Sequence, residues 1–255
     1  MTYCMALAPD AGLVFISDSR TNAGVDDVST YSEMNHFGVE GERQFVILSS
    51  GNLGTTQSVI SRIKRDMRDN AEESLSTMPT IRDAAEYLGR INVDIQNKHA
   101  ENADSINYEA NFIIGGQIKD AKQGIFLVYP QGNNITTSKD TGFLQIGESK
   151  YGKPILDRII KPDTSLETAT LCGLVSMDST MRSNLTVGPP IEVMIYEYDS
   201  LVINKRYRFE EHSDYLRELK RCWDENLKDA FSSLPPIAWC NNWDNALVTE
   251  GDSSS

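Results

Sequence analysis

The segment that decides the fold is Met1-Thr2-Tyr3-Cys4 together with the later run Leu13-Val14-Phe15-Ile16-Ser17-Asp18-Ser19-Arg20-Thr21. A small residue at position 2 allows the initiator Met1 to be removed, which would give Thr2 both a hydroxyl nucleophile and a free amine. That amine, with an ordinary pKa of about 7.7 to 8.0, can act as the base for its own hydroxyl. Thr2 is therefore a candidate nucleophile. The alternative is that Thr2 is only the second residue of an edge strand.

Length and composition predict an ordinary globular protein. With 255 residues the chain can bury one substantial core, and we expect a single domain over residues 1–245 with a solvated tail at 246–255. The formal net charge of −13 argues against nucleic acid as a partner, because phosphate neutralisation needs a basic surface. The sequence has no apolar run of about 18 residues and no signal-peptide pattern. We therefore expect a cytoplasmic protein without a membrane partner.

The four cysteines lie far apart in the sequence, without a CxxC pair. They are Cys4, Cys172, Cys222 and Cys240. Such spacing favours reduced structural thiols over a disulfide framework or a zinc site. We expect no metal and no cofactor.

The first half of the chain predicts strands and then two helices. Short apolar runs indicate strands at 5–7, 12–17 and 44–49, with turn residues between them. A helix is expected from Thr55 or Thr56, and a second one from an N-cap at Thr80 to about His99.

The second half repeats this order. Strands are expected at 110–118, 124–129 and 143–146, helices at about 150–160 and 165–183, strands at 191–198 and 201–209, and a last helix at about 212–231. Blocks of strands that alternate with blocks of helices predict a layered α+β architecture, with helices packed on sheets, more than a parallel βαβ fold.

Three segments carry polar residues that could serve Thr2. Asp18 and Arg20 are two positions apart at a strand end, so both could face the Thr2 amine, although an ion pair at the surface is the alternative. The loop 49–54 could direct a backbone N–H at an oxyanion, or it is simply a turn. The cluster 176–183 could hold the amine, or its hydroxyls only cap a helix.

Taken in order along the chain, these segments resemble proteasome β-type subunits. The matching positions, spread over about residues 2 to 210, are Thr2, Asp10–Val14, Asp18–Thr21, Ser50–Gly54, Gly115–Gly116, Tyr129–Gly132, Ile146–Ser149 and Asp178. Within that superfamily the opening Met1–Cys4, the segment Gly147–Pro154 and the segment Asp178–Asn184 look most like the bacterial ancestral β-subunit group, Anbu, a relative of HslV.

The resemblance implies a four-layer αββα sandwich of the N-terminal nucleophile hydrolase type. It implies self-association into a ring or helical multimer with interior active sites, a peptide or unfolded protein as substrate, and room for an ATP-driven unfoldase as partner. By position, Thr2 would be the nucleophile of a threonine-type peptidase, Asp18 would hold the charge network, the Gly51 N–H would bind the oxyanion and Asp178 would orient the amine. Supporting residues would be Arg20, Glu148 or Ser149, and Ser179 or Ser183.

One position departs from the family. Proteasome β-type subunits carry a lysine that lowers the hydroxyl pKa, whereas this chain has Glu33 there and no lysine before Lys64. A carboxylate in that place is expected to oppose attack by Thr2. The rival interpretations are a non-catalytic assembly or binding subunit and an N-terminal nucleophile amidohydrolase that acts on a small amide.

Overall fold

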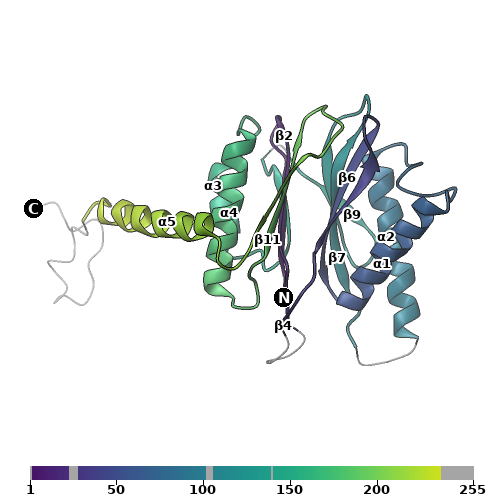
Figure 1. Cartoon of the computed structure of the whole chain (residues 1–255), viewed down its shortest axis with the longest axis horizontal. Helices are drawn as coiled ribbons and strands as arrows, with labels where there is room; N and C mark the ends of the chain where they lie inside the picture. Colours follow the sequence, from purple (N-terminus) through teal and green to yellow (C-terminus); the bar gives the residue numbers. More distant parts are fainter. Residues whose placement is uncertain (1, 23–27, 102–105, 139, 237–255) are drawn as a thin grey trace, which may run out of the picture.

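Two antiparallel sheets of five strands face each other at the centre of the molecule, and helices cover their outer sides (Figure 1). The computed structural model describes residues 2–22, 28–101, 106–138 and 140–236. Met1, Cys240 and the tail expected at 246–255 lie outside these described residues. The layer order of helices, sheet, sheet and helices confirms the expected α+β four-layer αββα sandwich.

The first sheet contains the N-terminal strand as an internal strand with a partner on each side. Its strands run in the order β10-β1-β2-β11-β12 and comprise Phe143–Gly147 (β10), Tyr3–Leu7 (β1), Gly12–Asp18 (β2), Ile191–Glu197 (β11) and Lys205–Phe209 (β12). Its outer face packs against α3 (Lys153–Ile159) and α4 (Leu166–Ser183). Because β1 lies between β2 and β10, the residue before it is held from two sides.

The second sheet has the order β5-β6-β7-β8-β9. Its strands are Met34–Val39 (β5), Arg43–Gly51 (β6), Ala110–Ile118 (β7), Gly124–Val128 (β8) and Asn134–Thr136 (β9). Helices α1 (Leu53–Arg68) and α2 (Ile81–Ala100) cover its outer face. A separate ribbon of β3 (Arg20–Asn22) and β4 (Val28–Thr30) lies at the end of the sandwich where the described chain begins (Figure 1).

Strand alternation divides the core into three layers. In β1 the side chains of Tyr3, Met5 and Leu7 pack toward α3 and α4, whereas Cys4 and Ala6 lie between the two sheets. Successive side chains of a strand point to opposite faces. Continued one residue further, this alternation directs Thr2 into the space between the sheets, as it does Cys4.

Local capping explains where the helices begin. The Thr80 side chain accepts from the Asp83 N–H and starts α2, as predicted. Helix α1 begins at Leu53, earlier than the expected Thr55 or Thr56, because the Asn52 side chain accepts from the Thr55 N–H and acts as the N-cap. None of the described helices combines the length and the apolar character needed to cross a bilayer.

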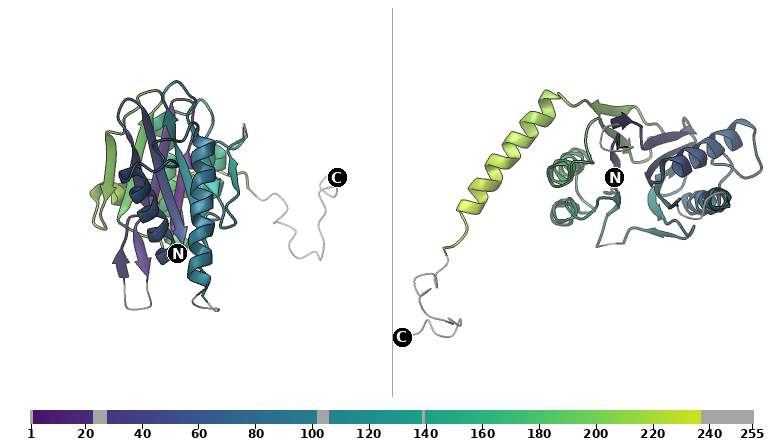
Figure 2. Two further views of the ribbon diagram at one scale, coloured as in Figure 1. Left: turned by 90° about the vertical axis from the view of Figure 1, so that its right-hand side faces the viewer. Right: turned by 90° about the horizontal axis from the view of Figure 1, so that it is seen from below.

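The last helix, α5 (Asp214–Ser232), extends away from the sandwich as an arm (Figure 2). Its first half lies near α4, and the arm then continues past the layered body toward the C-terminus. The sequence predicted this helix within two residues at each end, but it did not predict that half of the helix would leave the body.

Candidate active site

Thr2 lies directly before β1 with its backbone fixed on both sides. The residue is buried, with 9% of its surface exposed. Its carbonyl oxygen accepts from the Glu148 N–H at 2.9 Å, which continues the pairing of β1 with β10. The next amide, the N–H of Tyr3, donates to Asp18 Oδ1 at 2.8 Å. Two segments remote in sequence therefore set the position of Thr2.

The Asp18 side chain binds the backbone of β1 at the point where the hydrogen-bond ladder between β1 and β2 ends. The last pair of that ladder joins Cys4 to Ser17, and the Asp18 carboxyl then accepts from the Tyr3 N–H and, at 3.1 Å, from the Gly188 N–H. Burial raises the pKa of Asp18 to about 7, although the two backbone N–H groups favour its charged form. The structure thus brings Asp18 to the backbone that carries Thr2.

The loop that follows α4 is the partner that sequence reasoning missed. Besides the bond from Gly188, this loop receives a hydrogen bond from Arg20 Nη1 to the Leu185 carbonyl oxygen at 3.1 Å. The Arg20 guanidinium lies against Gly188 so closely that a Cβ there would overlap it. In the sequence, the signal for this contact was Gly188, the glycine directly before Pro189 and Pro190.

Gly147 allows three segments to meet at Thr2. Its φ of +79° lies in the left-handed region that favours glycine. A Cβ at this position would overlap the Thr2 carbonyl oxygen and lie 3.2 Å from Ser50 Oγ. The end of β10, Thr2 and the end of β6 are therefore in close contact, and Ser50 joins the predicted residues of the site.

The orientation of the Gly51 N–H is compatible with its predicted role. On β6 the Ser49 N–H donates toward β5, to the Glu33 carbonyl oxygen, while the Asn52 N–H donates toward β7, to the Glu109 carbonyl oxygen, both at 2.9 Å. Because N–H groups alternate sides along an antiparallel strand, the Gly51 N–H points away from β7. The ladder between β6 and β5 ends at the pair of Leu48 and Met34, three residues before Gly51 on β6. Oxyanion binding by Gly51 stays a prediction.

Glu33 and Met34 occupy opposite faces of the second sheet. Glu33 Oε2 accepts from Ser49 Oγ at 2.5 Å, and Ser49 lies across the strand pair from Glu33. Met34 pairs with Leu48, and both belong to the core layer between the sheets that also contains Cys4. The register therefore gives Met34, rather than Glu33, the face toward which the strand alternation directs Thr2.

The charge of Glu33 still reaches the site. Burial, with a smaller contribution from the nearby Glu192, raises the pKa of Glu33 to about 7 although the hydrogen bond from Ser49 lowers it. Burial also raises the pKa of the Cys4 thiol, and Glu33 and Asp18 add to this effect. The expected influence of Glu33 on Thr2 thus has a route through this cluster of acids, and it stays a prediction.

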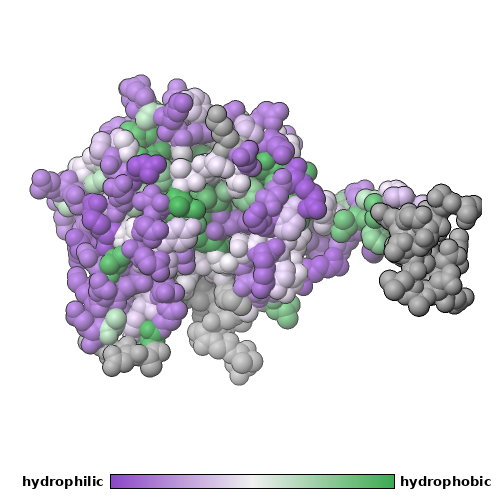
Figure 3. Space-filling view, turned by 180° about the vertical axis from the view of Figure 1, so that it is seen from behind, coloured by the Kyte–Doolittle hydropathy of each residue, from purple (hydrophilic) through white to green (hydrophobic). Residues whose placement is uncertain are grey.

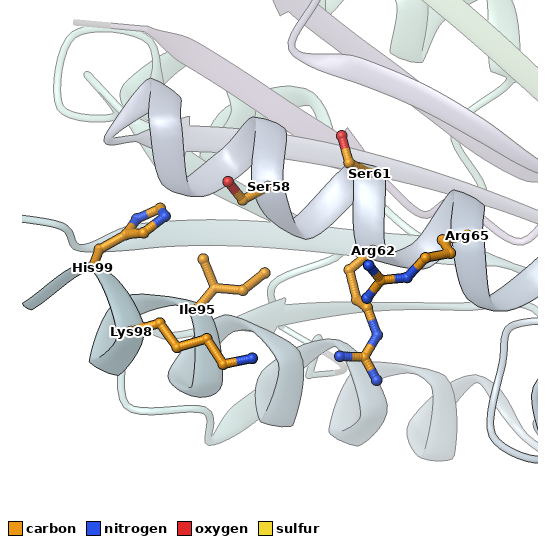
Figure 4. Close-up of a pocket in the computed structure, with 7 residues that line it drawn as sticks. All are labelled: Ser58, Ser61, Arg62, Arg65, Ile95, Lys98 and His99. Carbon is orange, nitrogen blue, oxygen red and sulfur yellow. The ribbon is translucent and has the colours of Figure 1, made fainter. Parts of the chain in front are cut away.

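A cavity of about 250 Å³ adjoins Glu33 on the helix side of the second sheet. Polar side chains of α1, among them Thr56, Gln57 and Lys64, line it together with Ser49. A different cleft lies between α1 and α2, where Arg62, Arg65 and Lys98 extend from the two helices (Figure 4). That cleft includes no residue bonded to Thr2 or Asp18, so we do not include it in the site.

On the helix side of the first sheet, the Tyr3 hydroxyl joins β1 to α4 by a hydrogen bond. It shares a hydrogen bond of 2.8 Å with Ser176 Oγ and accepts from Gln145. Burial raises the pKa of Tyr3 to about 12, so this hydroxyl stays protonated at neutral pH. Ser176 is the first residue of the hydroxyl cluster noted in the sequence, and its hydroxyl bonds to β1.

The other predicted residues of α4 lie elsewhere on the helix. Asp178 is half-buried; burial raises its pKa, and the charges that act on it are Lys220 and Asp224 of α5 and Arg182 of α4. Ser179 is half-buried and Ser183 is exposed. The contacts described for these three residues do not include Thr2, so their roles at the amine stay predictions.

Glu148 and Ser149 lie at the turn between β10 and α3. Glu148 acts on Thr2 through its backbone N–H, and its side chain lies 3.9 Å from the Lys150 ammonium. The Ser149 carbonyl oxygen accepts from the Lys153 N–H at the start of α3. Within the described part of the chain, no group of three His, Cys, Asp or Glu side chains is placed to hold a metal ion.

A buried threonine before the first strand of a four-layer sandwich is the arrangement expected of an N-terminal nucleophile hydrolase, and the similarity to solved structures narrows this class to the proteasome-like proteins. The chain is 43% identical to Anbu (ancestral beta-subunit) from Yersinia bercovieri, with 92% of this chain and 98% of that chain covered and a TM-score of 0.87. The helical assembly of the Anbu complex from Pseudomonas aeruginosa is 42% identical over 94% of this chain and 100% of that one, with a TM-score of 0.89. Anbu from Hyphomicrobium sp. strain MC1 is 42% identical over 92% and 99%, with a TM-score of 0.83.

No protein-family model and no curated protein matches the sequence. The identities above 40% over nine-tenths of the chain are nevertheless sufficient. The chain belongs to the Anbu family of proteasome-like proteins. This result confirms the resemblance found in the sequence.

Proposed function

We propose that the protein is a threonine-type peptidase in which Thr2, once Met1 has been removed, is the N-terminal nucleophile. The observation that carries the proposal is the fixation of the Thr2 backbone by Glu148 on one side and by Asp18, through Tyr3, on the other. A nucleophile gains rate from being held in one geometry before the substrate arrives. Fixation of the Thr2–Tyr3 peptide group at both its C=O and its N–H supports this condition.

The proposed reaction proceeds through an ester. The Thr2 amine takes the hydroxyl proton as Oγ bonds to the peptide carbonyl carbon, and the oxyanion accepts from the Gly51 N–H. The carbon to nitrogen bond then breaks, and the leaving amine takes that proton. Water next attacks the acyl ester, gives a proton to the Thr2 amine, and releases the acid as the hydroxyl is restored.

Asp18 is proposed as a positioning residue rather than a proton carrier. Its two oxygens bind the N–H groups of Tyr3 and Gly188, so they lie in the backbone network under Thr2. Through Gly188, the same carboxyl ties the loop after α4 to the strand that carries the nucleophile. We also predict that Asp178, which lies on α4 before this loop, orients the Thr2 amine.

Self-association forms part of the proposal. The Pseudomonas aeruginosa relative forms a helical assembly, and we infer that this chain also assembles with copies of itself into a ring or helical multimer. Active sites that face an interior would admit peptides and unfolded chains. An ATP-driven unfoldase would be a fitting partner, and a cytoplasmic location would suit both.

The proposal is tested with Thr2→Ala in a turnover assay on a fluorescently labelled unfolded protein. We expect Thr2→Ala to abolish peptide release, because Oγ forms the covalent bond. Thr168→Ala, which changes an exposed threonine of α4, serves as the matched control and should retain the rate of the unmodified protein. Equal turnover by the Thr2→Ala variant would contradict the proposal.

One observation favours a second candidate function. The residue that faces the space between the sheets is Met34, which has no charge to lower the hydroxyl pKa, and the neighbouring Glu33 is an acid. A subunit with this pair would keep the fold and the assembly while losing the peptidase reaction. Assembly with no turnover on peptides or small amides would support that candidate.

A further inference from the structure

Two buried serines at the end of β2 face the space between the sheets. Leu13 and Phe15 of the same strand belong to the core layer in that space. Because side chains alternate along a strand, Ser17 and, directly after the strand, Ser19 face the same way. Ser17 is 0% and Ser19 1% exposed. The inward row of β2 side chains therefore changes from apolar groups to hydroxyl groups as it approaches Thr2.

The register of β1 and β2 sets Ser19 opposite Thr2. The last pair of the ladder joins Cys4 to Ser17, and the same register two residues further along each strand joins Thr2 to Ser19. The hydrogen bond that Asp18 accepts from the backbone of β1 keeps the two strands together between these pairs. Ser19 and Thr2 are thus cross-strand neighbours whose side chains are directed to the same inner face.

Thr2 and Ser19 form the close kind of antiparallel pair. The Thr2 carbonyl group points to β10, where it accepts from the Glu148 N–H, so the main-chain groups of Thr2 are directed away from β2. In pairs without main-chain hydrogen bonds the side chains approach each other more closely. Cβ atoms of such pairs lie about 4.5–5.5 Å apart, and Thr and Ser side chains in this position form cross-strand hydrogen bonds.

The backbone around Ser19 is fixed, whereas its hydroxyl is not used. The Ser19 carbonyl oxygen accepts from the Tyr31 N–H at 3.0 Å, and the neighbours Asp18 and Arg20 are bonded as described above. Among the described residues, Ser19 Oγ has no hydrogen-bond partner. Polar groups are ordinarily solvated on the hydrophilic outside of the molecule (Figure 3), and a buried hydroxyl without a partner costs stability. A partner for Ser19 Oγ is therefore expected, and Thr2 is the hydroxyl residue opposite.

We propose that Ser19 is a further catalytic residue, whose hydroxyl donates a hydrogen bond to Thr2 Oγ and stabilises this oxygen as it loses its proton. A hydrogen bond to the charged form of a group favours that form. Ser19 keeps its own proton, and the proton of the Thr2 hydroxyl goes to the Thr2 amine as in the reaction proposed above. The inference rests on that proposed function and adds a residue to its machinery.

The acids near Thr2 make a neutral donor useful. Burial, Glu33 and Asp18 together raise the pKa of the Cys4 thiol, which is two residues from Thr2. The same carboxyl groups oppose the loss of a proton from the Thr2 hydroxyl. A serine hydroxyl can donate in this buried place without the cost of burying a further charge.

Covalent labelling of Thr2 by a threonine-directed electrophile tests the role of Ser19. Ser19→Ala and Ser17→Ala each remove one buried hydroxyl from the same inner face, and neither hydroxyl has a partner among the described residues. Only Ser19 lies opposite Thr2. We expect the labelling rate to fall about 10- to 100-fold in Ser19→Ala and by less than about twofold in Ser17→Ala. Ser19→Thr keeps a hydroxyl and should restore most of the rate.

A double-mutant cycle tests the contact without relying on catalysis. The urea midpoint of unfolding is measured for Ser19→Ala and Ser17→Ala, each in the wild-type chain and in Thr2→Ala. If Ser19 bonds to Thr2 Oγ, we expect Ser19→Ala to lower the midpoint in the wild-type chain but not in Thr2→Ala. Ser17→Ala should shift the midpoint equally in both chains.

Each contrary result has a separate meaning. Equal labelling rates of Ser19→Ala and the wild type would overturn the role of Ser19 while Thr2 stays the nucleophile. An equal loss of labelling in Ser17→Ala would assign the effect to repacking of the inner face. Equal midpoint shifts of Ser19→Ala in the two chains would show that the Ser19 and Thr2 hydroxyls are not bonded. A wild-type chain that is never labelled would contradict the proposed peptidase itself.

Discussion

Asp18 binds the backbone of Tyr3, the residue that directly follows Thr2, with a hydrogen bond of 2.8 Å from the Tyr3 N–H to Asp18 Oδ1. This bond replaces the main-chain pairing that ends one step earlier, between Cys4 and Ser17. The Asp18 side chain thus takes the place of a main-chain hydrogen bond between β1 and β2, next to the candidate nucleophile Thr2. Movement of Asp18 and movement of Thr2 are therefore coupled.

This coupling predicts the effect of Asp18→Asn. The amide can accept from only one of the N–H groups of Tyr3 and Gly188, so the other end of the clamp is released and Thr2 shifts. We expect the rate of covalent labelling of Thr2 by a threonine-directed electrophile to fall about 10- to 100-fold, as small misplacements of reacting groups do. Asp10→Asn, in an exposed turn, should label at the unmodified rate. Equal rates in the two variants would refute the clamp.

Gly147→Ala should displace Thr2 and so prevent its labelling, whereas Gly142→Ala should leave the position of Thr2 unchanged. At 147 the new methyl group overlaps the Thr2 carbonyl oxygen, and the φ of +79° costs about 1–2 kcal/mol for a residue other than glycine. At 142 the nearest atom lies 3.7 Å from the new Cβ, an ordinary contact. We expect labelling of Thr2 to fall more than tenfold only in Gly147→Ala, with circular dichroism showing that both variants fold. Normal labelling of Gly147→Ala would contradict the geometry.

The opposite faces of Glu33 and Met34 predict different results for two lysine variants. Met34→Lys adds an ammonium on the face of the sheet toward which Thr2 is directed, where a positive charge would lower the hydroxyl pKa by about one unit or more. We expect a gain of roughly tenfold in labelling rate. Glu33→Lys, on the other face, should gain less, chiefly by removing a negative charge near Asp18. The reverse order would assign the lysine's place to Glu33.

The stability of Glu33→Gln should depend on pH. Burial raises the pKa of Glu33 from 4.5 to about 7, so between these values the folded state holds a proton that the unfolded chain has lost. Stability therefore falls as pH rises through this window. Gln cannot ionise, and we expect Glu33→Gln to be more stable than the wild type by up to about 3 kcal/mol at pH 8 and equal to it near pH 4.

Urea unfolding of Glu33→Gln at several pH values measures this difference. Glu86→Gln, which changes an exposed glutamate of α2, is the control and should show no such trend. Asp18 titrates in the same range, and the Glu33 charge raises its pKa, so the measured difference includes this coupling between the two carboxyl groups. A difference that is constant with pH would show that Glu33 does not ionise in this window.

The sequence predicted the parts of the fold that depend on local signals. Thr80 capped α2 as expected, because a threonine with Asp83 three residues later is recognisable without tertiary contacts. The strand at 12–17 was found from its apolar run, and it pairs with β1 as a hairpin. The ordered family motifs led to the αββα class and to Anbu.

Long-range pairing limited the prediction of the site. That Glu148 would bind Thr2 depends on β10 lying beside β1, about 140 residues away in the chain, and Gly188 reaches Asp18 by a loop with no strong motif. Glu33 was compared with the family's lysine by sequence position, whereas a shift of one residue reverses the face of a strand. The register shows that the adjacent Met34 has the face toward which Thr2 is directed.

Intact mass spectrometry before and after exposure to a threonine-directed covalent probe tests the central claim most directly. The account predicts a protein that has lost Met1 and gains one adduct, mapped to Thr2 by fragmentation and absent in Thr2→Ala. A chain that retains Met1, or one that is trimmed but stays unlabelled, would contradict it.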